Sequence, residues 1–476
     1  MKQEFGLPPL CVDLDGTLIH SDLLLETLLL LLKRNPFYFF LLPVWLLNGK
    51  AELKAKIAKR IVFNPAALPY NHLFLGWLQN QSYAERDVWL CTASNYRLAY
   101  PVAEYLQIFS GVLASTDDTN LSGSIKAKQL IEKFGEKGFD YCGNHRVDLA
   151  VWQVSQSAIV VNCSDRLTRD IGGVADIGAI FPKPSGILRS MLKALRPHHW
   201  AKNLLVFVPL AAAHKISEGI SVEYALLAFL AFNLCASSVY LLNDLLDLEA
   251  DRQHPRKCRR PFASGDLPLC VGFMLIPLLL LGAALSAMHL PARFLVVLGG
   301  YYALTISYSL SLKRIVLVDI ITLAELYSAR IVAGAMAINV RLSVWLLLFS
   351  FFLFLSLALL KRYAELDDVR RQGKLKAAGR GYHIKDLPIL HGFGTASGYF
   401  CVLILVLYIH SPAINALYRH PQFLEFLCLL LPYWISRVWL KAYRGAMHDD
   451  PVIFAMKDRI SLLILVFSAI TICLAV

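Results

Sequence analysis

Residues 241–255 read LLNDLLDLEADRQHP, so an apolar run ends here in a cluster of oxygen-bearing side chains. Within a helix, residues four positions apart lie on one face, and Asn243, Asp247 and Asp251 have this spacing. Asp244 lies about 100° from Asn243 around the same helix. Such donors are costly at the end of an apolar helix unless a cation binds them, and Mg²⁺ prefers oxygen ligands. The stretch therefore predicts a membrane helix that ends in a Mg²⁺ site made by these four residues.

The rest of the chain beyond about residue 200 alternates apolar stretches with short charged loops. Overall, 57% of the 476 residues are hydrophobic and 17% are charged. A membrane span needs about 20 mostly apolar residues. The candidate spans are roughly 202–214, 222–242, 268–288, 292–311, 315–337, 342–360, 387–409, 422–440 and 460–476. We therefore expect residues 191–476 to form an all-α membrane domain of about nine transmembrane helices.

The charged loops indicate the orientation of this domain. Lysine and arginine are concentrated in alternate loops, at 252–260, 313–314, 361–385 and 441–459. The positive-inside rule places these loops and the N-terminal part in the cytoplasm, and the start of the chain has no long apolar stretch typical of a cleavable signal peptide. We expect a multi-pass protein of the inner (cytoplasmic) membrane. Its oligomeric state is left open.

Composition also narrows the classes of partner. The formal net charge of +12 suits the anionic lipids of a bilayer and anionic substrates. The basic residues lie at membrane boundaries, so no nucleic-acid partner is expected. The ten cysteines are scattered without a CxxC pair, which argues against disulfides or a zinc site.

The N-terminal part begins with a different acidic motif. Residues 10–19, LCVDLDGTLI, read as a short apolar strand followed by Asp13 and Asp15. Alternate residues at a strand end share a face, and Gly16 permits a tight turn. Two carboxylates so placed can hold Mg²⁺ while one attacks a phosphorus atom. DxDGT after an apolar strand resembles the haloacid-dehalogenase (HAD) phosphatase superfamily.

Further segments resemble the remaining motifs of that superfamily in the expected order. VWLCTAS (88–94) contains Thr92, GSIKAKQL (123–130) offers Lys126 ahead of Lys128, and FDYCGNHRVDLAVW (139–152) contains Asp148. The resemblance implies an α/β, Rossmann-like domain over residues 1–190. It also implies that Asp13 is the nucleophile, that Asp15 is the general acid/base, and that Thr92 and Lys126 hold phosphate. Asp13, Asp15 and Asp148 would bind the metal.

One position departs from the superfamily pattern. The first acid of its metal-binding GDxxxD motif is Asn144 in this chain. Asparagine can donate an oxygen to Mg²⁺ but brings no charge, so a lower metal affinity is expected. Two alternatives stay open, an active phosphatase and a decayed domain that serves as a scaffold.

A helical cap is expected over about residues 22–85. Its most apolar part, 23–60, is broken by Pro36 and Pro43 and carries a Lys-Arg pair at its centre, which argues against one clean span. These features favour a cap that lies on or dips into the bilayer. The alternative is a buried pair of cap helices.

The opening stretch has the form NDxxDxxxD, which resembles the first Asp-rich motif of the UbiA superfamily of membrane prenyltransferases. The resemblance implies that Asn243, Asp247 and Asp251 act in catalysis by holding a Mg²⁺-bound diphosphate leaving group. Basic residues after the motif would contact the remaining phosphate oxygens, and Lys257 and Arg260 are the candidates.

Other stretches indicate the donor. RPHHWAKN (196–203), YSLSLKRIVLVDI (308–320), LKRYAELDD (360–368) and residues 437–459 together resemble the decaprenyl-phosphate phosphoribosyltransferase branch. That branch implies phosphoribosyl diphosphate as donor and a polyprenyl phosphate as acceptor. The further candidate substrate-binding residues are Lys202, Asn203, Tyr308, Lys313, Arg330, Lys361, Arg362 and Glu365. Two have ordinary alternatives, since Arg330 can pair with Glu325 and Tyr308 can be an interfacial anchor.

The two halves together suggest consecutive reactions in cell envelope biosynthesis. The HAD-like domain would remove the 5-phosphate of the lipid-linked product, which would make the transfer effectively irreversible. A UbiA-type prenyltransferase that uses a prenyl diphosphate is the nearest alternative, and inward, metal-binding Asp367 and Asp368 would favour it. A membrane-anchored HAD phosphatase and a transporter are more distant alternatives.

Overall fold

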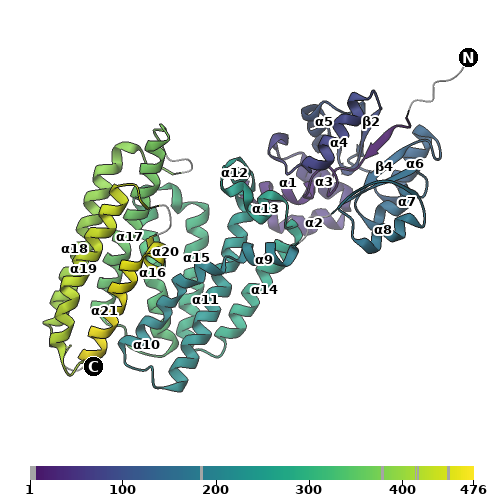
Figure 1. Ribbon diagram of the computed structural model, residues 1–476. Coiled ribbons are helices and arrows are strands. Elements are labelled where there is room, and N and C mark those ends of the chain that lie inside the picture. Colours follow the sequence, from purple (N-terminus) through teal and green to yellow (C-terminus); the bar gives the residue numbers. More distant parts are fainter. Residues whose placement is uncertain (1–6, 183–185, 377–379, 413, 415–416, 448–450) are drawn as a thin grey trace, which may run out of the picture. The chain divides into compact units, whose positions relative to one another are not determined.

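The computed structural model in Figure 1 describes the whole chain except residues 1–6, 183–185, 377–379, 413, 415–416 and 448–450. It divides into two compact units. Unit 1 consists of Met1–Leu195 and Tyr240–Leu275, and unit 2 of Arg196–Val239 and Ile276–Val476. The helices α11 (Gly219–Leu246) and α14 (Leu269–Ala287) contribute residues to both units.

A parallel sheet of six strands, in the order β3-β2-β1-β4-β5-β6, forms the centre of unit 1. The strands are β1 (Leu10–Val12), β2 (Val88–Asn95), β3 (Gly111–Ser115), β4 (Asp140–Gly143), β5 (Ser157–Val161) and β6 (Asp176–Phe181). In the central register, Val12 pairs with Leu90 on one side and Cys142 on the other. The strand order reverses at β1, and ligands of such sheets bind at the carboxyl ends of the strands near this switch point.

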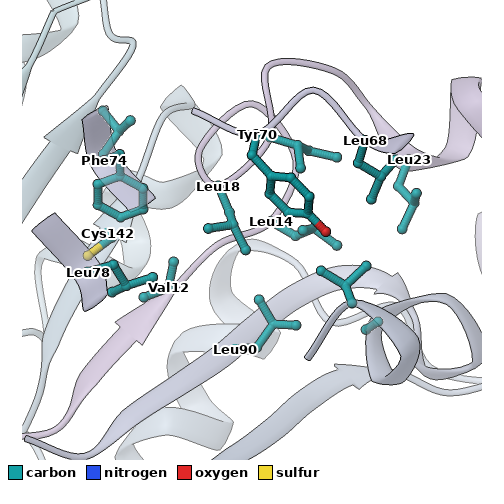
Figure 2. Close-up of a cluster of buried hydrophobic side chains, with 14 of the residues drawn as sticks. Val12, Leu14, Leu18, Leu23, Leu68, Tyr70, Phe74, Leu78, Leu90 and Cys142 are labelled. Atoms are coloured by element: carbon teal, nitrogen blue, oxygen red, sulfur yellow. The ribbon is translucent and has the colours of Figure 1, made fainter. Parts of the chain in front are cut away.

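Helices pack against the sheet of unit 1. They are α4 (His72–Tyr83), α5 (Tyr96–Leu106), α6 (Gly123–Phe134), α7 (Leu149–Trp152) and α8 (Asp165–Gly172), with the short η2 (Pro65–Ala67) and η3 (Arg146–Asp148). Figure 2 shows the main core, in which Val12 and Leu90 of the sheet lie with Phe74 and Leu78 of α4. Apolar runs such as Leu10–Val12 form strands here because both faces of a parallel sheet are buried.

The cap follows β1 as α1 (Leu23–Arg34), η1 (Pro36–Phe40), α2 (Leu42–Leu47) and α3 (Lys50–Ala58). Asp22 starts α1, because its carboxylate accepts hydrogen bonds from the amides of Leu24 and Leu25. The helix ends before Pro36, in agreement with the prediction that proline prevents a single span. The cap has its own small core of Leu31, Trp45 and Ile57.

The later segment of unit 1 carries the Asp-rich motif. It contains the end of α11, then α12 (Leu248–Gln253), η5 (Lys257–Arg259), α13 (Pro261–Ser264) and the start of α14. The helix α9 (Ile187–Leu195) also belongs to unit 1.

The named elements of unit 2, in the part that the structure describes, are all helices, with one isolated β-bridge between Lys376 and His383. Its remaining elements are η4 (Pro197–Phe207), α10 (Val208–Ala212), α15 (Ala292–Leu310), η6 (Leu312–Arg314), α16 (Val318–Ala337), α17 (Val344–Arg371), η7 (Ile384–Asp386), α18 (Leu387–Ile409), η9 (Pro421–Phe426), α19 (Leu427–Tyr443), α20 (Pro451–Lys457) and α21 (Arg459–Ala475).

Six helices among the described residues are long and apolar enough to cross a membrane, or up to seven if the bent pair α20 and α21 is one span. The predicted count of nine is therefore not confirmed. The stretch 202–214 forms short helical pieces, η4 and α10, instead of one long helix.

Candidate active sites

The first candidate site lies at the carboxyl end of β1 and β4. Lys126 of α6 places its Nζ 3.0 Å from Asp13 Oδ1 and donates a 2.8 Å hydrogen bond to the Tyr141 hydroxyl. Tyr141 in turn donates to Asp148 Oδ1 at 3.1 Å. All four residues are buried. The fold thus brings three predicted residues together and adds Tyr141, which the sequence motifs did not indicate.

Asp15 connects this strand end to the cap. Its Oδ1 accepts a 2.7 Å hydrogen bond from the Leu23 amide, and its Oδ2 accepts one of 2.8 Å from Ser94 Oγ. The fully buried Thr92 accepts from the Ser94 amide at 3.0 Å, at the point where the register of β2 shifts between Thr92 and Asn95. Ser94 is a second residue that sequence reasoning missed, although it stands inside the quoted motif.

The electrostatics of the two aspartates differ from those of exposed carboxyl groups. Burial raises the pKa of Asp13 to about 6, although Lys126 opposes the rise. Burial also raises the pKa of Asp15 to about 7, and repulsion from Asp22 and Asp13 adds to it. Burial disfavours the charged form of Lys126, but Asp13 and Asp148 outweigh it, and the net pKa of Lys126 is raised. Near neutral pH the site can therefore hold one ionised carboxylate beside one that carries a proton.

Asn144 lies against the turn that carries the aspartates. A Cβ at Gly16, which has a φ of +73°, would lie 1.9 Å from Asn144 Nδ2, so this turn requires glycine. The Asn144 and His145 amides donate to Asp148 Oδ2 at 3.2 and 3.0 Å. The oxygen donors here are of the kind that Mg²⁺ prefers. Within the described part of the chain, however, no three His, Cys, Asp or Glu side chains converge as a metal site.

The cap contributes a cation that the sequence motifs did not indicate. Lys54 of α3 donates hydrogen bonds of 2.6 Å to the Ala93 carbonyl oxygen and 2.9 Å to Asn120 Oδ1. Burial lowers the pKa of Lys54, while the nearby Asp15 and Asp22 oppose the change. Several lysines occur between 50 and 59, and only the folded cap shows which of them turns toward β2.

The second candidate site is the Asp-rich motif of unit 1. The predicted continuous helix is interrupted, because α11 ends at Leu246 and Asp247 is the N-cap of α12, with φ −103° and ψ 15°. Hydrogen bonds from the Asp247 amide to the Asn243 carbonyl (3.0 Å) and from the Asp251 amide to the Asp247 carbonyl (2.8 Å) preserve the four-residue spacing. The Asp247 side chain makes no capping hydrogen bond, so its carboxylate is not used to start α12.

Cations of the chain contact this motif. Arg260 Nη1 lies 3.0 Å from Asp244 Oδ1 and 2.5 Å from Asp251 Oδ2, and both aspartates are buried. Lys33 of the cap places its Nζ 3.5 Å from Asp247 Oδ1. Burial raises the pKa of Asp251, although Arg260 opposes it. Lys257 is exposed on η5. Carboxylate and amide oxygens form a donor set of the kind that Mg²⁺ prefers, and Arg260 is a cation in contact with two of the carboxylates.

A buried polar network lies in unit 2, around two of the predicted residues. Arg330 donates to Asn203 Oδ1 (2.7 Å) and to the Tyr301 hydroxyl (2.9 Å), and Asn203 donates to Asn233 Oδ1 (2.7 Å). A Cβ at Gly334 would lie 2.0 Å from the Val206 carbonyl oxygen, so α16 and η4 pack backbone to backbone and bring these side chains together. No ion pair between Arg330 and Glu325 occurs among the described residues, so that alternative has no support.

A second cluster surrounds Arg362 of α17. Its Nη2 lies 2.6 Å from Asp319 Oδ2, and its guanidinium also pairs with Glu365. Arg380 Nη1 lies 3.2 Å from Glu365 Oε2, and the Tyr382 hydroxyl donates to Asp319. Asp319 is a further member that sequence reasoning missed as a site residue, although an aspartate within an apolar span signals a functional partner.

The remaining predicted residues of unit 2 are placed on nearby elements. Lys202 Nζ lies 5.6 Å from the centre of the Tyr327 ring. Tyr308, Lys313 and Lys361 are half-buried on α15, η6 and α17.

Asp367 and Asp368 are the residues that a second Asp-rich motif would use. Asp367 is buried, forms an ion pair with Arg370 and lies 2.8 Å from Arg371 Nε, whereas Asp368 is exposed. The two aspartates thus do not face one another as metal ligands.

Known proteins resemble this chain over different lengths. A protein called uncharacterized protein y4nM, from Sinorhizobium fredii, is 35% identical over 95% of this chain and 88% of its own length. Decaprenyl-phosphate phosphoribosyltransferase of Mycolicibacterium smegmatis is 39% identical over 40% of this chain and 61% of its own length. The solved UbiA homologue from Archaeoglobus fulgidus, bound to GPP and Mg²⁺, is 15% identical with a TM-score of 0.47 and covers 60% of this chain and 99% of its own.

The family assignment rests on a family profile. The profile of the UbiA prenyltransferase family matches residues 204–462, which is more than half of the chain. The matched range contains the Asp-rich motif and all six helices of membrane-spanning length. The chain is therefore a multi-pass membrane protein and belongs to the UbiA prenyltransferase family.

Proposed function

We propose that this chain transfers a phosphoribosyl group from phosphoribosyl diphosphate to a polyprenyl phosphate. An oxygen of the lipid phosphate forms a bond to the ribose C1, the bond between C1 and the diphosphate oxygen breaks, and diphosphate leaves. Bound Mg²⁺ would neutralise charge on the leaving diphosphate. In this proposal the transfer occurs at the cytoplasmic face of the inner membrane, in the formation of lipid-linked sugars for the cell envelope.

The neutralised Asp367 is the observation that carries the choice of donor. A prenyltransferase that binds its diphosphate between two Asp-rich motifs needs a second acidic metal site, but Asp367 pairs with Arg370 and Arg371, and Asp368 is exposed. The neighbouring Arg362 is buried and forms ion pairs with Asp319 and Glu365, so these two acidic groups are not free for a metal either. The 39% identical relative named as a phosphoribosyltransferase supports the same choice.

The roles within this proposal follow from the chemistry of the side chains. Asn243, Asp244, Asp247 and Asp251 would hold the metal, while Arg260 and Lys257 would contact diphosphate oxygens. The 5-phosphate and the lipid phosphate need further cations, for which Lys202, Lys313 and Lys361 are the candidates. Arg330 and Asn203, which share a buried network in unit 2, are further candidates for binding substrate.

The N-terminal sheet supports a second proposed activity, that of an HAD-type phosphatase acting on the lipid-linked product. Asp13 would attack the 5-phosphate phosphorus while Asp15 protonates the departing ribose oxygen, and water would then release inorganic phosphate from Asp13. Lys126 and Thr92 would contact the phosphoryl oxygens. The network joining Lys126 to Asp13, Tyr141 and Asp148 supports this assignment over a decayed scaffold, because it keeps a buried cation beside the nucleophile.

A donor comparison tests both proposals. The purified chain in nanodiscs is given polyprenyl phosphate with labelled phosphoribosyl diphosphate or with prenyl diphosphates, with and without Mg²⁺. We expect labelled lipid and diphosphate only with the sugar donor and Mg²⁺, followed by inorganic phosphate. Turnover only with prenyl diphosphates would establish the prenyltransferase alternative. Phosphate release that survives Asp13→Asn would refute the phosphatase assignment.

A further inference from the structure

The end of the cap presents an unusual apolar surface. We define the cap tip as Pro36–Leu47, which comprises η1, Leu41 and α2. Phe37 is 76% exposed, Phe40 72% and Leu47 87%. The other exposed large apolar side chains of the cap tip are Phe39, Leu41, Val44 and Leu46. Single exposed apolar residues are ordinary, but a contiguous group of this kind indicates an interaction surface.

The cap tip is a folded element, not a loosened core. Trp45 turns inward onto Leu31 and Ile57, so the segment has an inner and an outer side. The Asn35 side chain accepts from the Phe37 amide at 3.0 Å, and the Leu41 and Trp45 amides bond to carbonyls three and four residues earlier. A helical backbone with internal hydrogen bonds is the kind of structure that can enter a hydrocarbon environment.

The charges around the cap tip favour an anionic bilayer as its partner. Residues 27–51 contain three basic residues, Lys33, Arg34 and Lys50, and no acidic residue. An apolar end bordered by cations is the pattern of an element that lies in the interface of an anionic bilayer. Unit 1 also contains the segment that joins α11 and α14, two helices of membrane-spanning length, so this unit adjoins a membrane.

We propose that the cap tip inserts its outer side into the interface of the bilayer that the chain spans. The insertion anchors the cap in the layer where a polyprenyl-linked phosphomonoester has its headgroup. The phosphatase can then take this substrate while the polyprenyl chain stays in the membrane. The exposed apolar surface of the cap tip is sufficient to support the anchoring, whereas the role of the anchoring in substrate capture also rests on the proposed function.

Photocrosslinking tests the anchoring without reference to any activity. p-Benzoylphenylalanine is placed at Phe40 in the full chain, reconstituted in nanodiscs of phosphatidylglycerol and phosphatidylcholine. The matched control has the same group at Tyr83, which is 83% exposed and lies on α4, beyond the cap elements α1, η1, α2 and α3. We expect lipid adducts from position 40 and none from position 83. Adducts at position 40 only to a second copy or to another part of this chain would overturn the proposal.

A kinetic comparison tests substrate capture. The triple variant Phe37→Ser, Phe40→Ser, Leu47→Ser is assayed with the phosphorylated lipid product in nanodiscs and with soluble p-nitrophenyl phosphate. We expect kcat/KM for the lipid to fall by about tenfold or more, because the interfacial anchor is lost, with little change for the soluble ester. Leu73→Ser, on the exposed face of α4, should change neither value.

The outcomes separate the two parts of the inference. An equal loss with both substrates would show that the cap tip serves the fold of the phosphatase and would refute substrate capture. Lipid adducts at position 40 in a chain that hydrolyses neither substrate would retain the anchoring and refute the proposed phosphatase.

Discussion

The two acidic sites of unit 1 both combine aspartate carboxylates with a cation of the chain, but different parts of the fold bring these groups together. At the sheet edge, Asp13 follows β1 and Asp148 ends η3, and these distant residues are joined through Lys126 and Tyr141. In the Asp-rich motif, Asp244 and Asp251 come from one short segment and are joined through Arg260. In each, a buried or half-buried cation of the chain balances paired carboxylates.

The difference lies in what holds the carboxylates. The sheet-edge site depends on the parallel register of β1 with β4, so it exists only when unit 1 is folded. The Asp-rich motif depends on local helical spacing, which survives even the break at Asp247. We therefore expect substitutions in the two sites to have separable effects.

The largest effect is expected from Asp13→Asn. Loss of the proposed nucleophile should lower phosphate release by on the order of 10³-fold or more, whereas diphosphate release from the proposed transfer should not change. Both are measured on one reconstituted preparation. Asp118→Asn, at an exposed position, is the control. A parallel loss of both activities would mean that the sites are not independent.

The next largest effect concerns the ion pair between Glu26 and Arg252, which are 8% and 10% exposed and lie 2.6 Å apart. Glu26→Ala leaves a buried guanidinium without its carboxylate and should destabilise unit 1 by about 3–5 kcal/mol. Denaturant unfolding of the full chain in detergent measures this. The double variant Glu26→Leu, Arg252→Met should regain most of the loss, and no recovery would show that the pair is not the cause.

Asp251→Asn tests the other site. The variant keeps the shape of the side chain but removes a charge from the motif, and transfer should fall by about 10²-fold. Hydrolysis of a soluble phosphomonoester should be unaffected. Glu249→Gln, outside the four-residue spacing, is the matched control. If Glu249→Gln were the more damaging change, the metal ligands would have to be reassigned.

The smallest effect is expected from Asn144→Asp, which restores a charge beside Asp148. The Mg²⁺ concentration for half-maximal phosphatase activity should fall by about tenfold, because an anionic ligand binds the cation more tightly. Asn144→Ala should shift it the other way. An unchanged Mg²⁺ requirement in both variants would place the metal away from residue 144.

Local patterns predicted much of this structure. The apolar strand before Asp13, the proline breaks in the cap and the spacing from Asn243 to Asp251 all depend on nearby residues, and each has its counterpart in the fold. The parallel six-stranded sheet agrees with the α/β class that the motifs implied.

Features set by distant contacts escaped prediction. Tyr141 contacts Lys126, which is 15 residues away in the sequence. Lys54 contacts Ala93 at a separation of 39 residues, and Asp319 contacts Arg362 at a separation of 43. The helix break at Asp247 was not predicted either, because the spacing of apolar residues in the sequence continues past it. The predicted count of nine spans is not confirmed, and the apolar stretch at 202–214 forms the short pieces η4 and α10.

The pair between Glu26 and Arg252 has a consequence for the order in which the chain is made. Glu26 leaves the ribosome 226 residues before its partner, and α11 lies between them. The cap helix therefore cannot complete its contacts until a membrane helix has been synthesised and the segment after it has emerged. Maturation of the N-terminal part is thereby linked to membrane insertion, and a fragment that ends at residue 195 would lack the partner of Glu26.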